Sequence, residues 1–200
     1  MEAASTPVAG ATDYPARYDV EYPERLSRWK IFVKWLLAIP HFIIVYLLQI
    51  VAGLMTIVAF FAILFTKKWP RGMFDFMVQI QRWTENVLVY ALTLQRDEYP
   101  PFSGDEGEYP VRLEVDYDEN LSRWLIFVKW LLVIPHLIVL LFLFIAAYVV
   151  VFIAFFAILF TGKYPRGMFD FVVGVFRWTV RVNAYGQWLM TDRYPPFSLK

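Results

Sequence analysis

The sequence contains no cysteine and only two histidines in 200 residues. The lack of thiols excludes disulfides, thiolate nucleophiles and cysteine-ligated metals. The chain also lacks a glycine-rich nucleotide loop, a G-x-S-x-G nucleophile motif and an H-E-x-x-H metal motif. An enzyme would have few groups to work with, so we expect a protein that is not an enzyme and carries no cofactor.

Charged residues are missing from two long stretches. Trp35–Thr66 is a run of 32 residues without Asp, Glu, Lys or Arg, and Trp130–Thr161 is a second one of the same length. Apolar runs of about 18 or more residues predict membrane-spanning helices. Because 59% of the chain is hydrophobic and 20% is aromatic, we expect an integral membrane protein. A formal net charge of +1 gives no support for nucleic acid as a partner.

The first residues show no signal-peptide pattern, since no short apolar segment precedes a cleavage site. We expect residues 1–13 to form a disordered tail. Arg25, Arg28 and Lys34 precede the first apolar run, and positive charge beside a span favours the cytoplasmic side. The sequence therefore predicts a multi-pass protein of the cell inner membrane with a cytoplasmic N-terminus.

The chain is an internal duplication. At an offset of 95 residues, 14–105 aligns with residues 109–200 without gaps, with 53 identities in 92 pairs. IFVKWLL, AFFAILFT and PRGMFDF occur once in each copy. We therefore expect two membrane repeats, 14–105 and 109–200, of the same structure.

Each copy divides into four predicted segments. YPVRLEVDY alternates apolar and charged residues, which predicts a short strand outside the membrane, able to pair with YPARYDVEY in the first copy. PERLSRWKIFVKWLLAI is basic on one face and rich in Trp and Leu on the other, which predicts either an amphipathic helix at the membrane interface or a basic flank that precedes a span. Its basic residues, which we expect at the lipid headgroups, are Arg25, Arg28 and Lys34 with Arg123 and Lys129 in the second copy.

Pro40 predicts a break in the long apolar run. A transmembrane helix is expected over 41–65 and 136–160, followed by a second amphipathic helix over 73–94 and 168–190. The chain is thus predicted to be an all-α integral membrane protein. Strand pairing needs both strands on one side of the membrane, which favours two crossings per copy and four spans in total. In the two-span alternative, the second amphipathic helix lies flat on the membrane.

The second amphipathic helix carries the charged candidates for a site. Ionisable residues inside a membrane protein are functional candidates, and the polar face holds Asp75, Arg82, Asp170, Arg177 and Arg181. The pairs Asp75–Arg177 and Asp170–Arg82 would join the two copies, either as structural links or as an ion path. A local contact of each aspartate with Arg71 or Arg166 is the simpler possibility.

His41 and His136 occupy equivalent positions after a proline. Two imidazoles related by a duplication can serve as axial ligands of a haem or a chlorophyll-type pigment. The plainer interpretation places both rings in the headgroup region, where their polar edges stay wet.

The blocks RLSRWKIFVKWLLAIPH, AFFAILFTKKWPRGMFDF and YPPF resemble a bacterial family of duplicated membrane proteins known as domain of unknown function 4389. The resemblance covers nearly all of residues 14–200 and implies a helical protein of the bacterial inner membrane. It implies no activity and no ligand.

These features favour a non-enzymatic membrane subunit or scaffold, whose partners are the lipid bilayer and another membrane protein or a second copy of itself. The alternatives are a small transporter or channel that uses the polar helix faces, and pigment binding through the histidines.

Overall fold

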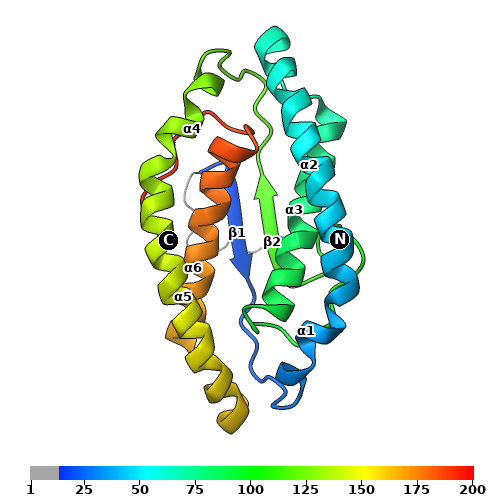
Figure 1. The fold of residues 1–200 in the computed structure, drawn as a ribbon, viewed down its shortest axis with the longest axis vertical. Helices are drawn as coiled ribbons and strands as arrows, with labels where there is room; N and C mark the ends of the chain where they lie inside the picture. Colours follow the sequence, from blue (N-terminus) through cyan, green and yellow to red (C-terminus); the bar gives the residue numbers. More distant parts are fainter. Residues whose placement is uncertain (1–13) are drawn as a thin grey trace, which may run out of the picture.

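The computed structural model describes residues 14–200; the expected N-terminal tail, residues 1–13, lies outside the described residues. Each sequence copy contributes one strand, two short helical turns and two long helices (Figure 1). The elements are β1 (Ala16–Val20), η1 (Lys30–Phe32), α1 (Lys34–Leu37), α2 (Ile39–Thr66), α3 (Arg71–Ala91), β2 (Val111–Val115), η2 (Leu125–Phe127), α4 (Lys129–Leu132), α5 (Ile134–Thr161), α6 (Arg166–Val182) and the π-helical η3 (Asn183–Gln187).

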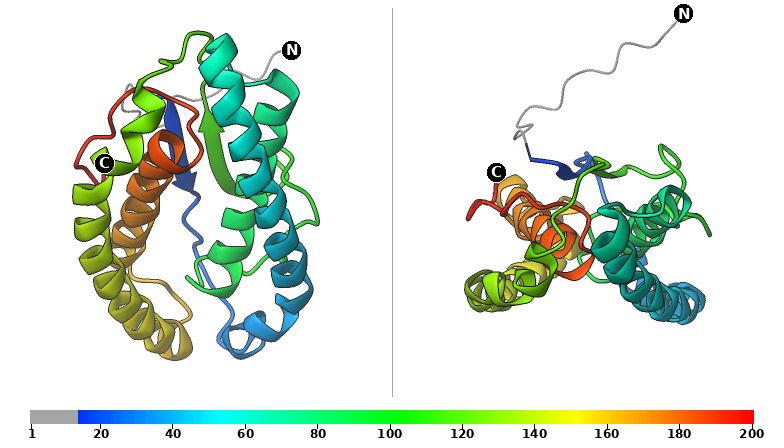
Figure 2. Two further views of the ribbon diagram at one scale, coloured as in Figure 1. Left: turned by 45° about the horizontal axis from the view of Figure 1, so that its top comes forward. Right: turned by 90° about the horizontal axis from the view of Figure 1, so that it is seen from above.

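The elements form three layers, seen end-on in Figure 2. The first is the two-stranded sheet, the second is the pair α3 and α6, and the third is the pair α2 and α5, which stand apart from each other. The strands pair in antiparallel fashion with Ala16 opposite Val115 and Val20 opposite Val111. The structure confirms the predicted strands and their pairing.

The two sequence copies exchange their strands. β1 comes from the first copy but packs on α6 of the second, whereas β2 packs on α3 of the first copy. The segments after the strands are exchanged as well, because Leu26 N–H donates to the carbonyl of Gly162 and Leu121 N–H to that of Lys67, both at 2.8 Å. The copies are therefore interlocked rather than placed side by side.

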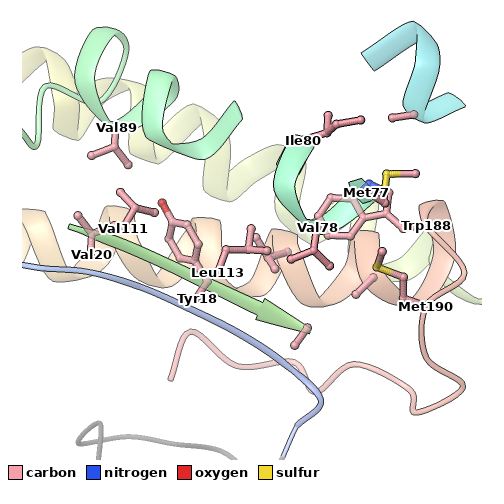
Figure 3. Close-up of a cluster of buried hydrophobic side chains, with 14 of the residues drawn as sticks. Tyr18, Val20, Met77, Val78, Ile80, Val89, Val111, Leu113, Trp188 and Met190 are labelled. Carbon is pink, nitrogen blue, oxygen red and sulfur yellow. The ribbon is translucent and has the colours of Figure 1, made fainter. Parts of the chain in front are cut away.

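The core lies between the sheet and the middle helices (Figure 3). Tyr18, Val20, Val111 and Leu113 point inward from the strands and are at most 4% exposed. Side chains of α3, such as Val89, meet them from the helix layer. The alternate strand residues turn outward, where Arg17 forms ion pairs with Glu114 at 3.1 Å and with Asp116 at 2.6 Å.

The predicted break near Pro40 is confirmed. α2 begins at Ile39, with Pro40 in its first turn, where a proline costs no helical hydrogen bond. At its other end Lys67 adopts the left-handed conformation with φ 62°, and Gly162 takes the same role after α5 with φ 69°. The following helices, α3 and α6, also correspond to the predicted ones.

The predicted amphipathic helix before α2 is wrong as a continuous element. Residues 23–29 are not helical, and only the short η1 and α1 follow. The backbone N–H groups of Leu26 and Ser27 donate instead to Gly162 and to the Asp97 carboxylate. A segment whose donors bind distant partners cannot close the helical hydrogen bonds that its side-chain pattern suggests.

α2 and α5 are long and apolar enough to cross a membrane, and only 22% and 17% of their most apolar stretches are buried. Within residues 14–200, α3 and α6 do not meet the same criteria. The number of spans therefore stays a prediction.

Candidate functional site

Arg82 of α3 and Arg177 of α6 form hydrogen bonds with the strand that the other copy contributes. Arg82 is buried and donates from Nε and Nη2 to the carbonyl of Leu113, at 3.2 and 2.9 Å, and from Nη1 to that of Gly104 at 2.9 Å. Arg177 donates to the carbonyl of Tyr18 at 2.8 Å and to the carboxylate of Asp19 at 2.9 Å. Both arginines thus reach across the duplication, to backbone carbonyls for the most part.

The predicted pairs Asp75–Arg177 and Asp170–Arg82 do not form. Asp75 and Asp170 are exposed, and each pairs with the arginine four residues earlier, Arg71 or Arg166, at 3.1 Å. The local alternative is therefore confirmed. The aspartates begin a helix at the end of the molecule, whereas the arginines lie two turns further along, under the sheet.

Arg181 is 1% exposed and lies in the interior beside Tyr14. Its guanidinium is centred 5.9 Å from the Tyr14 ring, and the Tyr14 hydroxyl donates to the Arg181 carbonyl at 3.3 Å. Its counterpart in the first copy, Asn86, is also buried. The five charged candidates thus form no continuous path.

Lys34 and Lys129 are not at an interface with lipid or water, because both are fully buried. Lys34 Nζ lies 2.7 Å from Asp97 and Lys129 Nζ lies 2.8 Å from Asp192. Burial lowers the pKa of both lysines from the ordinary value, and the paired carboxylates oppose that shift. The prediction was wrong because helical spacing gives the direction of a side chain but not what lies over it.

The other three basic candidates do lie on the surface. Arg25, Arg28 and Arg123 are exposed, and Arg123 donates to the carbonyl of Phe65 at the end of α2, at 3.0 Å. The neighbouring tryptophans, Trp29 and Trp124, are each 80% exposed. Arg123 and Trp124 of the second copy therefore lie at the end of α2, which belongs to the first copy. Arg28 and Trp29 of the first copy lie in the same way at the end of α5.

The histidines are buried in aromatic cages, not wet. His41 and His136 are 0% exposed. Trp83 Nε1 donates to Nδ1 of His41 at 3.1 Å, and Trp178 Nε1 donates to Nδ1 of His136 at 3.0 Å. Phe102 stacks on His41 with ring centroids 4.0 Å apart, as Phe197 does on His136 at 3.8 Å.

This arrangement argues against a metal ligand. A neutral imidazole that accepts at Nδ1 carries its proton on Nε2, and ligation through Nε2 would turn a second N–H toward the indole N–H. The first turns of α2 and α5 also lie at opposite ends of the molecule (Figure 1). The two histidines of one chain therefore cannot hold a single ring between them.

A cleft of about 930 Å³, which we call the central cleft, separates the two helical hairpins. Its apolar walls come mainly from α5, with Phe144, Val151 and Phe155, and from Phe176 of α6. Its polar residues are Gln49 of α2, Gln81, Thr84 and Glu85 of α3, Thr93, and Thr179, Asn183 and Gln187 near the end of α6. Its volume is at the upper end of the range of about 300 to 1,000 Å³ for ligand sites.

The first copy supplies the most polar part of this cleft. Gln49 Nε2 donates to Oγ1 of Thr84 at 2.8 Å and to Oε1 of Gln81 at 3.2 Å. Burial raises the pKa of Glu85 to about 8. The Tyr18 phenol interacts electrostatically with this carboxyl group, but neither Glu85 Oε2 nor the Tyr18 hydroxyl has a hydrogen-bond partner of normal geometry within residues 14–200.

Sequence reasoning missed the central cleft. The available signal was the comparison of the copies, in which Phe144, Phe176 and Val180 stand where the first copy has Gln49, Gln81 and Glu85. Gln49 belongs to α2 and Gln81 and Glu85 belong to α3, and all three line the cleft. The polar residues of α3 therefore serve two surfaces, one toward the sheet and one toward the cleft.

Fold and site together define a duplicated, mostly helical protein with two long apolar helices, a small two-stranded sheet and an amphipathic cleft. The chain belongs to the family described as Domain of unknown function (DUF4389), whose model matches residues 28–104 and 123–198, once in each copy. Searches of curated proteins and of solved structures find no match.

Proposed function

We propose that this chain is a non-enzymatic membrane scaffold whose helices α2 and α5 lie in the plane of one leaflet of the cell membrane. The observation that carries the proposal is a large apolar face opposite the polar sheet. We call it the membrane face; it comprises the exposed hydrophobic residues of the outer helix layer, among them Ile43, Leu47, Leu54, Phe61 and Phe65 of α2 and Ile138, Leu141, Val149, Phe156 and Phe160 of α5.

The position of the sheet favours this orientation over a span. α2 packs along α3, α3 packs along β2, and the axes of the strands are roughly parallel to those of the long helices (Figure 1). If α2 crossed the bilayer, the sheet would enter the hydrocarbon with Arg17 and Arg112 on its outer side and one open edge on each strand. Unpaired backbone groups and charges are both strongly disfavoured there.

The path of the chain supports the same orientation. α2 and α5 run in opposite directions, and the chain passes from one end of the molecule to the other through the extended segment that includes β2 (Figure 1). In a spanning orientation this strand would be a membrane crossing, and a strand crosses hydrocarbon only within a closed barrel. In the in-plane orientation it stays in water, above the helices.

The rim of the membrane face carries the kinds of side chain that are found at the lipid headgroups. Trp29 and Trp124 are 80% exposed beside the exposed Arg28 and Arg123. Tryptophan and basic residues gather where hydrocarbon meets headgroups, and a helix with one apolar face lies in that plane. We therefore expect a preference for anionic lipids.

Cysteine labelling tests the orientation, because the natural chain has no cysteine. Glu24 precedes α2 and Lys68 follows it, and both are exposed. In the in-plane orientation, single cysteines at the two positions react with a membrane-impermeant maleimide from the same side of sealed vesicles. Labelling from opposite sides would contradict the proposal. Glu119 and Lys163, both exposed, are the matched pair around α5.

The other functions receive less support. A transport path along α3 and α6 would need Arg82 and Arg177, which are engaged by the strands. Pigment binding would need His41 and His136 to release their tryptophan partners. A visible absorption band lost in His41→Ala, or ion flux lost in Arg82→Gln, would favour these alternatives.

A further inference from the structure

The central cleft opens on the membrane face. Tyr148 and Phe152, which line its outer edge, are 76% and 59% exposed. Both belong to α5, the helix that the proposed function places in the leaflet. If that placement holds, the mouth of the cleft meets acyl chains rather than water, and what enters it comes from the lipid phase.

The inner part of the cleft is polar but carries no positive charge. Among the residues that line it, none is Lys or Arg, and the one ionisable acid is Glu85. An anionic phosphate would enter without a counterion, next to a carboxyl group, and burying an unpaired charge is costly. The lining therefore disfavours an anionic headgroup and suits an uncharged group that forms hydrogen bonds.

The hydrogen-bonding groups lie where a lipid headgroup would reach them. Gln49, Gln81 and Thr84 already form one connected set. Glu85 Oε2 is shielded from solvent, and its carboxyl group interacts with the Tyr18 phenol. A carboxyl group can form more than one hydrogen bond, so a ligand hydroxyl would add to that interaction.

We propose that the central cleft binds one uncharged, hydroxyl-bearing lipid from the leaflet, of the diacylglycerol type, with its hydroxyl at Gln81 and Glu85 and its tails between α3 and α5. This inference rests on the proposed membrane orientation. It adds a ligand class and a set of residues that discriminate by charge.

Dioleoylglycerol and dioleoyl phosphatidate are matched probes, since they share their tails and differ in the charge of the head. The full chain is reconstituted in phosphatidylcholine vesicles that contain either dioleoylglycerol or dioleoyl phosphatidate. It is then extracted in mild detergent, and the mass of the protein with its bound lipid is measured by native mass spectrometry. We expect one retained dioleoylglycerol per chain and little phosphatidate. Equal retention of both lipids would overturn the proposal.

The duplication supplies the variant. Gln49→Phe, Gln81→Phe and Glu85→Val together install the residues that the second copy has at these positions, Phe144, Phe176 and Val180. We expect this triple variant to retain at least about tenfold less dioleoylglycerol, which corresponds to about 1.4 kcal/mol. Undiminished retention would overturn the assignment of the hydroxyl to these residues.

A pH series gives a readout that a packing defect would not produce. A bound lipid shields Glu85 from water and favours its neutral form, so retention by the natural chain should decrease as the pH rises above about 8. Glu85→Gln has an amide that does not titrate, so its retention of dioleoylglycerol, relative to its own value at neutral pH, should show no such decrease. The same decrease in Glu85→Gln would contradict the role of this residue.

The cysteine-labelling experiment separates the two proposals. If the natural chain labels at Glu24 and Lys68 from one side but retains no dioleoylglycerol, the lipid site is wrong and the membrane orientation stands. If the two positions label from opposite sides, the orientation is wrong and the lipid site loses its route of entry. The triple variant should keep the labelling pattern of the natural chain.

Discussion

The two copies of the repeat share the same buried hydrogen bonds and ion pairs, but they differ in the residues that line the cleft between them. Equivalent contacts are His41–Trp83 and His136–Trp178, Lys34–Asp97 and Lys129–Asp192, and the strand contacts of Arg82 and Arg177. The polar cleft residues Gln49, Gln81 and Glu85 have the apolar counterparts Phe144, Phe176 and Val180. The shared contacts hold the fold, and the diverged positions surround the space where a ligand fits. Changes in the shared set should therefore have equal effects in both copies, and changes in the cleft should not.

The buried lysine pairs should give the largest effect. Asp97→Ala leaves Lys34 without its carboxylate in the interior, and breaking a buried ion pair costs about 3 to 5 kcal/mol. Asp192→Ala should cost the same, because Lys129 is equally buried. Thermal unfolding in detergent measures both, with exposed Glu24→Ala as the control. A cost below about 1 kcal/mol, typical of surface pairs, would show that the lysines are not buried.

The strand-fastening arginines should come next. Arg82→Met removes three donated hydrogen bonds to backbone carbonyls, and bonds from a charged donor contribute about 1.5 to 3 kcal/mol each. We expect a loss of about 3 kcal/mol, because the apolar replacement recovers part of the packing. Arg177→Met should lose a similar amount. Arg71→Met, on the same helix but in an exposed pair, should change the unfolding free energy by less than about 1 kcal/mol.

The histidine cages should show a smaller, again symmetric effect. Trp83→Phe keeps an aromatic ring but removes the N–H that donates to His41, leaving a buried acceptor at a cost of about 1 to 2 kcal/mol. Trp178→Phe should match it. Chemical denaturation in mixed micelles gives the two free energies of unfolding, and a clear difference between them would show that the two histidine contacts are not equivalent.

Glu85 should make the stability of the first copy depend on pH. Its pKa is raised from 4.5 to about 8 in the folded chain, so the folded state holds its proton more tightly than the unfolded state does. The stability that this proton confers is complete below about pH 4.5 and is lost as the pH rises to about 8. Glu85→Gln should remove that decline in stability. Val180, its counterpart in the second copy, has no carboxyl group and causes no such decline. Unfolding temperatures across this pH range, with Glu24→Gln as the control, test the sign. An unchanged decline in Glu85→Gln would assign it to another group.

Local pattern predicted much of the fold. The alternation in YPVRLEVDY gave the strand, the position of Pro40 gave the start of α2, and the spacing of apolar residues gave α3 and α6. These features depend on neighbours in sequence, which is why they could be read without a structure.

The misplaced residues depend on contacts between distant segments. Lys34 follows the pattern of a surface helix but is covered by the segment around Asp97, and Arg82 contacts β2 rather than Asp170. A strand exchange leaves no periodic signal, because either copy can supply the partner. The central cleft was missed for the same reason, because its walls come from both copies. A helical-wheel projection of α3 alone cannot show which of its polar residues face the cleft.

The depth of α2 in the bilayer distinguishes the in-plane orientation from a membrane span. Ile43, Leu54 and Phe65 are spaced 11 residues apart, about three helical turns, and all three are at least 59% exposed on the membrane face. A bimane label at each position, quenched by lipids with nitroxides at known depths, reports how far each residue lies from the bilayer centre. We predict the same shallow depth at all three positions and a matching profile at Ile138, Val149 and Phe160 of α5. A label at Leu54 near the bilayer centre, with Ile43 and Phe65 near opposite surfaces, would show that α2 spans the membrane and would contradict the in-plane orientation.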